Sequence, residues 1–237
     1  AATPLPYADP LGGVAIMDFI AGRPLATYPG GAAALAKALG GLIAKVQATA
    51  PFPSLGDYPD AISNLLAGLR SSPLLPPGEL EPHADGLALI RAAVRWDSRT
   101  LVSSHNDPKP RNLIFDGNRL WLIDWELAFR NDPLVDVAIL TTEFAETPDM
   151  KDVLLEATLG VKPDRYLRAR LEVIRLLTRL FYGCVVLDSL RNTPLASSIP
   201  APSFTPSEFR RAVAEGRLAS GAPETAYAFA RMSLRAF

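Results

Sequence analysis

Two short apolar runs flank an Asp-Gly dipeptide near the middle of the chain, and this arrangement constrains the local fold more than any other feature. The first run is Leu113–Phe115, the turn is Asp116-Gly117-Asn118, and the second run is Leu120–Ile123. Asp-Gly between apolar runs is a strong signal for a β-hairpin. The sequence therefore predicts two antiparallel strands here, preceded by another short strand over Leu101–Ser104.

The predicted hairpin brings polar side chains from before and after it to one place. His105 and Asp107 follow the first short strand, and Asn112 ends the Pro-rich loop before the hairpin. Asp124 comes directly after the hairpin, so the turn returns it toward the loop that carries Asp107 and Asn112. The spacing His-x-Asp-x-x-x-x-Asn matches the catalytic loop of kinases.

These residue types fit the needs of phosphoryl transfer from a nucleotide. Such a transfer needs a carboxylate that accepts the proton of the acceptor hydroxyl, and oxygen ligands that hold Mg²⁺ on the phosphates. Mg²⁺ prefers oxygen donors and keeps several waters, so one carboxylate and one amide oxygen suffice. We therefore predict Asp107 as the catalytic base, and Asn112 and Asp124 as ligands of Mg²⁺.

A family resemblance rests on the segments HNDPKPRNLIFDG (105–117) and LIDWELAFRNDPLVDVA (122–138). Both are similar to the aminoglycoside phosphotransferase and choline kinase family, whose members have a protein-kinase-like fold and phosphorylate small molecules with ATP and Mg²⁺. The resemblance implies the same roles for Asp107, Asn112 and Asp124. It also implies that His105 braces the catalytic loop, and that Asp136 supports this loop from a following helix.

Two charged residues near the motif have open roles. Lys109 stands where many family members have His, and Pro108 and Pro110 restrict the directions that it can take. We predict that Lys109 is a catalytic residue that contacts the γ-phosphate during transfer, as the similar Lys-Pro of protein serine/threonine kinases suggests; a solvated loop lysine is the alternative. Glu126 either reaches the metal or the acceptor, or makes only a local hydrogen bond.

Asn106 stands where many family members have Gly, as it does in choline-kinase-like members.

The apolar run Val14–Met17 predicts a strand near the N-terminus. The segment resembles the family's hinge, which joins a small nucleotide-covering lobe to the large lobe. The resemblance places the backbone of Met17, Asp18, Phe19 and Ile20 against the adenine edge, because backbone N–H and C=O groups are fixed donors and acceptors. An ordinary edge strand is the alternative.

In the family, a small lobe of about a hundred residues precedes the hinge, whereas 16 residues precede Met17 here. No candidate for its phosphate-covering loop, strand lysine or helix glutamate is evident, so we expect the chain alone to bind ATP weakly. We expect residues 1–25 to hold the hinge and a remnant of the small lobe. Residues 26–237 should form the large lobe, with the catalytic loop in 101–124 and the acceptor-side helices in 134–237.

Apolar residues at helical spacing predict that most of the remaining chain is helical. The expected fold class is α+β and mainly helical, the large lobe of a protein-kinase-like fold with a small β-hairpin at the catalytic loop. We expect helices over residues 32–48, 62–69, 87–94, 134–145, 165–190, 206–220 and 223–237, and a loop over 192–206.

Composition excludes several other classes. With 49% hydrophobic and 21% charged residues, the chain is not disordered. The single cysteine, Cys184, makes no internal disulfide and indicates a reducing, cytoplasmic location. The most apolar long stretch, Leu171–Leu190, contains several charged residues and does not read as a membrane span. No basic stripe interleaved with aromatic residues is present, so nucleic acid is not an expected partner.

Charge is unevenly placed along the sequence. Residues 1–150 carry 11 basic and 17 acidic side chains, a net of −6, whereas residues 151–237 carry 13 and 8, a net of +5. Because the second part should line the acceptor pocket, we expect a polycation such as an aminoglycoside to be a poor acceptor.

The combined prediction is an ATP- and Mg²⁺-dependent phosphotransferase that acts on a hydroxyl of a small molecule. The main alternative is a non-catalytic kinase-like binding or scaffold protein. A metal phosphohydrolase that uses Asp107 and Asp124 is a second alternative, weakened by the lack of a second His or carboxylate cluster. The sequence identifies neither the acceptor nor the oligomeric state, and does not distinguish ATP from GTP.

Overall fold

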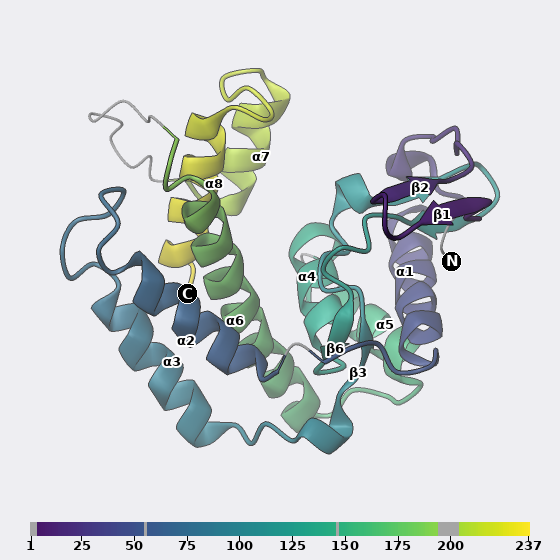
Figure 1. Cartoon of the computed structure of the whole chain (residues 1–237). Coiled ribbons are helices and arrows are strands. Elements are labelled where there is room, and N and C mark those ends of the chain that lie inside the picture. The colour runs from purple at the N-terminus through teal and green to yellow at the C-terminus, as the bar shows by residue number, and fades with distance from the viewer. Residues whose placement is uncertain (1–3, 55, 146, 194–203) are drawn as a thin grey trace. The chain divides into compact units, whose positions relative to one another are not determined.

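The computed structural model describes residues 4–54, 56–145, 147–193 and 204–237. This part of the chain is mainly helical and contains three two-stranded antiparallel sheets (Figure 1). The chain divides into two compact units, Ala1–Leu55 with Ser98–Arg175 and Gly56–Asp97 with Leu176–Phe237. Helix α6 (Arg165–Ser189) contributes residues to both units.

The first unit contains α1 (Gly31–Gln47), α4 (Val135–Phe144), α5 (Pro148–Leu159) and the N-terminal part of α6. Helices α1 and α5 lie side by side (Figure 1). A Cβ atom on Gly40 of α1 would come within 2.7 Å of Ala157 Cβ on α5, so the close approach depends on glycine at this position. The buried hydrophobic residues of α1 recur at three- and four-residue spacing: Leu35, Leu39, Leu42, Ile43 and Val46.

Two of the sheets lie at the motif residues. The predicted hairpin is present, with β4 (Leu113–Phe115) paired to β5 (Leu120–Leu122). In addition, β3 (Val102–Ser104) pairs with β6 (Phe129–Asn131), a strand that the sequence analysis did not predict. This pairing brings the segment that follows Asp124 back beside the strand that leads into the catalytic loop.

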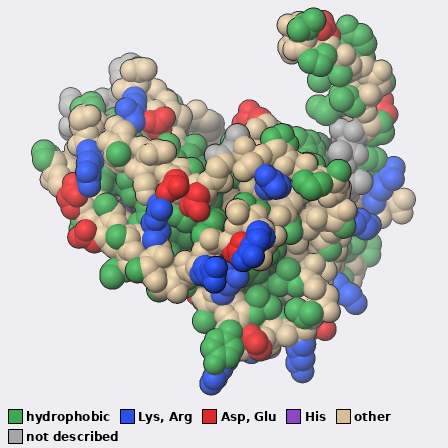
Figure 2. Space-filling view, turned by 60° about the horizontal axis from the view of Figure 1, so that its bottom comes forward, with side chains coloured by type: hydrophobic (Ala, Val, Ile, Leu, Met, Phe, Trp, Pro, Cys, Tyr) green, Lys and Arg blue, Asp and Glu red, His purple; other side chains and the backbone are tan. Residues whose placement is uncertain are grey.

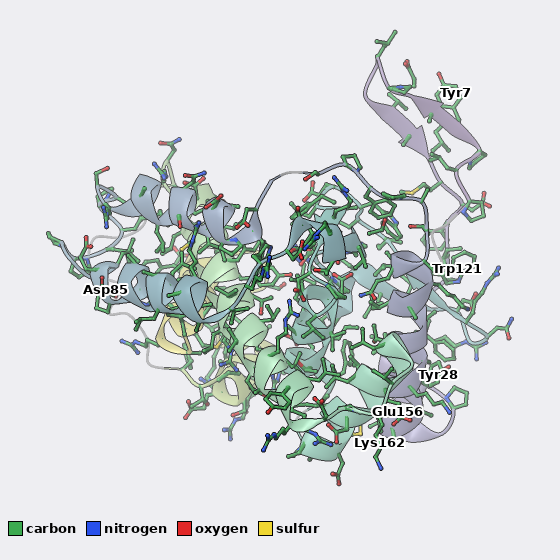
Figure 3. All side chains as sticks on the ribbon, turned by 90° about the horizontal axis from the view of Figure 1, so that it is seen from below. Tyr7, Tyr28, Asp85, Trp121, Glu156 and Lys162 are labelled. Carbon is green, nitrogen blue, oxygen red and sulfur yellow. The ribbon has the colours of Figure 1, made fainter. Side chains whose placement is uncertain are left out.

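The third sheet is an N-terminal hairpin of β1 (Tyr7–Asp9) and β2 (Val14–Ile16). Its turn is stabilised by Asp9, whose Oδ1 accepts hydrogen bonds from the backbone N–H groups of Leu11 and Gly12. Both strands are largely exposed, and hydrophobic side chains lie at their surface (Figure 2). Tyr7 is 51% exposed and lies away from the helices of its unit (Figure 3).

The second unit is built from α2 (Tyr58–Leu69), α3 (Glu81–Ala93), α7 (Pro206–Ala214), α8 (Pro223–Arg235) and the C-terminal part of α6. Its aromatic rings pack on one another, as the Tyr58 and Phe181 rings do at 5.2 Å between centroids. Cys184 is fully buried here, and this burial raises the pKa of its thiol to about 12. The thiol is therefore uncharged at neutral pH and unreactive.

The predicted helices are present, but α2 and α3 begin several residues earlier than expected, at Tyr58 and Glu81, each with a proline in its first turn. Helix α7 ends at Ala214, several residues before the expected end at 220, because Gly216 adopts a left-handed conformation (φ +72°) that a helix cannot continue. Helix α5 was not predicted. The expected loop over 192–206 lies mostly outside the described residues. Short 3₁₀ helices lie at Leu25–Thr27, Ser98–Thr100 and Pro110–Asn112. Within the described residues, no helix is long and apolar enough to cross a membrane.

Candidate active site

The predicted base, Asp107, follows β3 and is 4% exposed. Its Oδ2 accepts a hydrogen bond from the side-chain amide of Asn112 at 2.9 Å, and the same amide nitrogen donates to the Asp107 carbonyl at 2.9 Å. The ammonium of Lys109 lies 2.5 Å from Oδ2, with the lysine side chain 25% exposed. The structure therefore brings three predicted site residues into direct contact at one carboxylate oxygen.

The loop between these residues is compact because its backbone turns twice. The N–H of Lys109 donates to the carbonyl of Asp107 at 2.8 Å, and the N–H of Asn112 donates to the carbonyl of Lys109 at 2.9 Å. Pro110, at the start of the 3₁₀ turn, has a ring that fixes φ. The Pro-rich sequence thus holds Asn112 and Lys109 against the same aspartate.

His105 joins the loop to the hairpin. One of its ring nitrogens, Nδ1, accepts a hydrogen bond from the Asp107 N–H at 3.3 Å, so the other, Nε2, donates to the Ile123 carbonyl at 2.9 Å. These contacts define the tautomer with the proton on Nε2. The Trp125 ring packs edge-on against the imidazole at 4.8 Å between centroids.

Asp136, in the first turn of α4, lies fully buried beneath the loop. One carboxylate oxygen accepts the N–H of His105 at 2.9 Å, and the other accepts the N–H of Asn106 at 2.7 Å. Burial raises the pKa of the Asp136 carboxyl, and the hydrogen bond from the His105 N–H is the largest opposing effect. Asp136 therefore fixes the backbone of the two residues that precede the predicted base.

Asn106 has a structural role that the sequence analysis did not find. Its φ of +62° lies in the left-handed region, which Asn tolerates better than most residues. Its buried side-chain amide donates to the carbonyls of Leu127 at 2.9 Å and of Phe129 at 3.2 Å, and accepts from the Asn131 amide at 2.8 Å. Asparagine at this position in the motif is the sequence signal that could have indicated such a turn.

Asp124 also has a left-handed backbone, with φ of +67°. Such a conformation costs free energy for a non-glycine residue, and functional sites often contain it. The preceding residue, Ile123, donates its N–H to the Asn112 carbonyl at 3.0 Å. This bond ties the end of the hairpin to the catalytic loop, while the Asp124 side chain remains exposed.

The donor set fits a magnesium ion held by few protein ligands. The amide nitrogen of Asn112 makes the two hydrogen bonds to Asp107, so the amide oxygen is the atom that would face a metal. Asp124 would add an exposed carboxylate. No cluster of three or more His, Cys, Asp or Glu side chains suited to a metal occurs in the described part of the chain. Glu126 is exposed.

The four predicted nucleotide-binding residues follow β2 without regular secondary structure. The side chains of Met17 and Phe19 are 52% and 92% exposed, and the Asp18 N–H donates to the Pro4 carbonyl at 3.3 Å. Ile20 is partly buried. The chain then reaches the catalytic hairpin, where the N–H of Arg23 donates to the Phe115 carbonyl at 2.7 Å.

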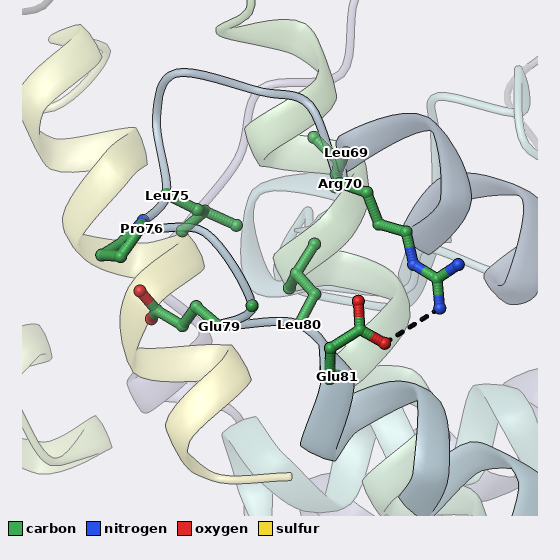
Figure 4. A pocket seen from close by; sticks show the side chains of 8 residues that line it. Leu69, Arg70, Leu75, Pro76, Glu79, Leu80 and Glu81 are labelled. Atoms are coloured by element: carbon green, nitrogen blue, oxygen red, sulfur yellow. Dashed lines mark hydrogen bonds and ion pairs between the residues drawn. The ribbon is translucent and has the colours of Figure 1, made fainter.

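A small cavity in the second unit is not a candidate for the acceptor site. It lies between the end of α2 and the start of α3, where Arg70 pairs with Glu81 at 3.0 Å (Figure 4). Its volume of about 10 Å³ is no more than one water needs. It is lined by Leu69, Arg70, Leu75, Pro76, Gly78, Glu79, Leu80 and Glu81.

Comparison with known proteins supports the fold and the family. A choline/ethanolamine kinase family protein from Mesorhizobium loti matches 98% of this chain and 79% of its own, with a TM-score of 0.67 and 24% identity. The choline kinase LicA from Streptococcus pneumoniae matches 82% of this chain and 69% of its own, with a TM-score of 0.63 and 16% identity. These likenesses confirm the predicted fold class, α+β and mainly helical with a protein-kinase-like fold.

At the sequence level, Protein LicA from Haemophilus influenzae is 42% identical over 52 residues, which are 22% of this chain. The matched stretch spans only 20% of that relative. The model of the phosphotransferase enzyme family, APH, matches residues 2–171. Since this match covers well over half of the 237 residues, the chain belongs to the phosphotransferase enzyme family.

Proposed function

We propose that this chain carries the catalytic site of a kinase that transfers the γ-phosphate of ATP, with Mg²⁺, to a hydroxyl group of a small molecule. The observation that carries the proposal is the buried Asp107 carboxylate, held by Asn112 and Lys109 in a loop that Asp136 anchors. A kinase-like catalytic loop needs a base of this kind, fixed in position.

In the proposed reaction, Asp107 accepts the proton of the acceptor hydroxyl while the hydroxyl oxygen attacks the γ-phosphorus; the bond to the bridging oxygen breaks and ADP leaves. The Asn112 amide positions the carboxylate through its hydrogen bond to Oδ2. The oxygens of Asn112 and Asp124 would hold Mg²⁺, which neutralises phosphate charge when bound. Lys109, beside the base, would contact the transferring phosphate as a compact point charge.

The nucleotide would lie against the backbone of Met17, Asp18, Phe19 and Ile20, through N–H and C=O groups that are fixed donors and acceptors. Two solved relatives support nucleotide use: LicA in complex with AMP, and a spectinomycin phosphotransferase in complex with ADP and spectinomycin. Their likenesses to this chain have TM-scores of 0.60 and 0.51. A cytoplasmic location forms part of the proposal, since the single cysteine suits a reducing compartment.

The proposed acceptor is a small hydroxylated metabolite, and choline is the first compound to test. Several solved relatives are named for choline or ethanolamine, and others for aminoglycosides or macrolides. The test measures ADP release from Mg²⁺–ATP with choline, ethanolamine, spectinomycin or kanamycin. Release that depends on an acceptor supports the proposal. ATP binding without any release supports a scaffold role, and phosphate release without an acceptor supports a phosphohydrolase.

Substitution of the site aspartates then separates their roles. Asp107→Asn should lower kcat by ~10²–10⁴, because it removes the general base while keeping the shape of the side chain. Nucleotide affinity should be nearly unchanged. Asp124→Asn should weaken Mg²⁺–ATP binding as well. Asp85→Asn, at an exposed aspartate of α3 outside the motif, is the matched control and should keep kcat. An Asp107→Asn protein with normal kcat would remove Asp107 from this role.

A further inference from the structure

A third buried aspartate, besides Asp107 and Asp136, lies next to the catalytic loop, in the Asn131-Asp132 pair before α4. The Asp132 side chain is 2% exposed, and its Oδ2 accepts a hydrogen bond from the Arg170 guanidinium of α6. Its Oδ1 accepts the N–H of Leu134 at 2.9 Å. Burial raises the pKa of this carboxyl, while the Leu134 N–H and then Arg170 oppose the rise. The Leu134 N–H and the Arg170 cation therefore both favour a charged aspartate here, and Arg170 is the one that a side-chain substitution can remove.

Asp132 caps the beginning of α4. Besides the bond to Leu134, its own carbonyl accepts the N–H of Val135, the first residue of the helix, at 3.0 Å. Leu134, at the N-cap position, offers no side-chain cap, and the Asp132 carboxylate and carbonyl instead hold the N–H groups of Leu134 and Val135 at the start of the helix. The first turn of α4 is the turn that carries Asp136. The position of Asp136 therefore depends on the cap that Asp132 provides.

The cap and the catalytic loop are also joined by Asn131. Its side-chain oxygen accepts the N–H of Asp132 at 2.9 Å, and its side-chain amide donates to Asn106 at 2.8 Å. A displacement of Asp132 would thus disturb the catalytic loop through two sets of hydrogen bonds, those of Asp136 and those of Asn131. Both sets end on residues directly before Asp107.

We propose that Arg170 is a positioning residue for phosphoryl transfer: its ion pair with Asp132 holds the first turn of α4, and through Asp136 and Asn131 it holds the catalytic loop in place. The reaction itself rests on the function proposed above. Arg170 would touch neither substrate nor nucleotide. A buried ion pair rarely adds net stability, but removal of one partner leaves an uncompensated buried charge. The asymmetry makes the pair testable.

The direct test is amide hydrogen exchange of this 237-residue chain, which needs no substrate. Arg170→Met leaves the buried Asp132 carboxylate without its cation, which should favour local opening of the loop. Exchange of the His105 and Asn106 N–H groups should therefore accelerate at least ~10-fold. Exchange in the buried face of α1, in the same unit, should stay unchanged. The double variant Arg170→Met with Asp132→Asn removes the stranded charge and should recover much of the protection. Arg170→Lys keeps the cation and should resemble the wild type.

The matched control is Arg168→Met, on the same helix. Arg168 pairs with Asp152 at 2.7 Å, but both side chains are substantially exposed and neither contacts the loop. It should leave exchange of the loop amides unchanged. Equal exchange in the Arg170 and Arg168 variants would overturn the proposal, as would an acceleration in Arg170→Met that spreads equally over α1. If Arg170→Met does not fold, Arg170→Gln replaces it in the same comparison.

Kinetics add a second readout. If the chain phosphorylates choline, Arg170→Met should lower kcat about 10-fold and change the KM for ATP by less than about 2-fold. The reason is that a misplaced base raises the free energy of the transition state more than that of the bound substrates. A change in KM alone would contradict positioning of the base. If no acceptor supports ADP release, the proposed function fails, and the exchange experiment still decides whether Arg170 holds the loop.

Discussion

Lys109 and Asn112 both contact the Oδ2 atom of Asp107, so the Lys109 ammonium lies beside the proposed base. Charge moves between oxygens during phosphoryl transfer, so we expect the ammonium to contact the γ-phosphate mainly in the transition state. Lys109→Met should then lower kcat more than it raises the KM for ATP. Steady-state kinetics at saturating acceptor measure both. Arg111→Met, which removes an exposed cation from the same loop, is the control. An unchanged kcat in Lys109→Met would show that the ammonium has no part in the transfer, despite its ion pair with Asp107.

At this scale the sequence predicted which segments come together better than it predicted the hydrogen bonds between them. The motif spacing was sufficient to expect Asp107, Asn112 and Asp124 near one another, because the Asp-Gly turn fixes the path between them. The hydrogen bonds of Asn106 and Asn131 could not be predicted in the same way. They depend on a left-handed backbone and on the pairing of β3 with β6, which are tertiary features.

The Asp116 carboxylate stabilises the turn of the β4–β5 hairpin. The N–H groups of Arg119 and Asn118 and the indole N–H of Trp121 donate to it, at 2.8, 2.7 and 2.7 Å. The bond from Arg119, followed by those from Trp121 and Asn118, lowers the pKa of Asp116 from 3.8 to about 2. The folded state therefore favours the charged form, and this contribution is present above the unfolded pKa and is lost as pH falls toward about 2.

Asp116→Asn should consequently destabilise the protein at pH 7 and cost progressively less as pH falls from about 4 to about 2. The measurement is urea unfolding of the wild type and the variant at several pH values, compared as differences so that other acid effects cancel. Asp152→Asn provides a second carboxylate for comparison, since its pKa is lowered chiefly by an Arg168 hydrogen bond rather than by a turn. A difference at pH 7 that persists unchanged to pH 2 would contradict this account.

Helix α1 contains two adjacent glycines with opposite surroundings. A Cβ on Gly40 would lie 2.7 Å from Ala157 Cβ and 2.8 Å from the Leu154 carbonyl oxygen, whereas a Cβ on Gly41 would meet nothing within 4 Å. In a helix interior, alanine gives a more stable folded state than glycine by about 0.5–1 kcal/mol. Gly41→Ala should therefore stabilise the protein by about that amount. Gly40→Ala should destabilise it by about 1–3 kcal/mol, because α1 and α5 must move apart.

Chemical denaturation of the two variants measures both effects, and each variant is the control for the other. Equal stabilisation by both substitutions would show that α1 and α5 are not in close contact at Gly40. The pair also tests α5 itself, the helix absent from our predictions. A start signal was present, since Thr147 accepts a hydrogen bond from the Met150 N–H and Pro148 follows it. The weak amphipathic pattern of residues 148–159 explains why periodicity alone did not find it.

At the scale of the molecule, the structure groups charges differently from the sequence. Residues 151–237 have a net charge of +5, but the second unit combines residues 176–237 with residues 56–97. It carries 7 + 3 = 10 basic and 4 + 6 = 10 acidic side chains, a net of zero. The first unit carries the remaining 14 basic and 15 acidic side chains. The basis for expecting repulsion of a polycationic acceptor is therefore lost, and aminoglycosides belong in the acceptor panel on equal terms.

Two nearly neutral units should exert little long-range force on a charged acceptor. Electrostatic steering raises association rates where net charge of one sign is concentrated, and salt screens it. We therefore expect kcat/KM for choline, at saturating Mg²⁺–ATP, to change less than about 2-fold between low and physiological ionic strength. The control acceptor is 3,3-dimethylbutan-1-ol, which has the shape of choline without its charge and corrects for effects of salt on the nucleotide. A steep fall for choline alone would show that acidic side chains gather around the acceptor despite the neutral sum.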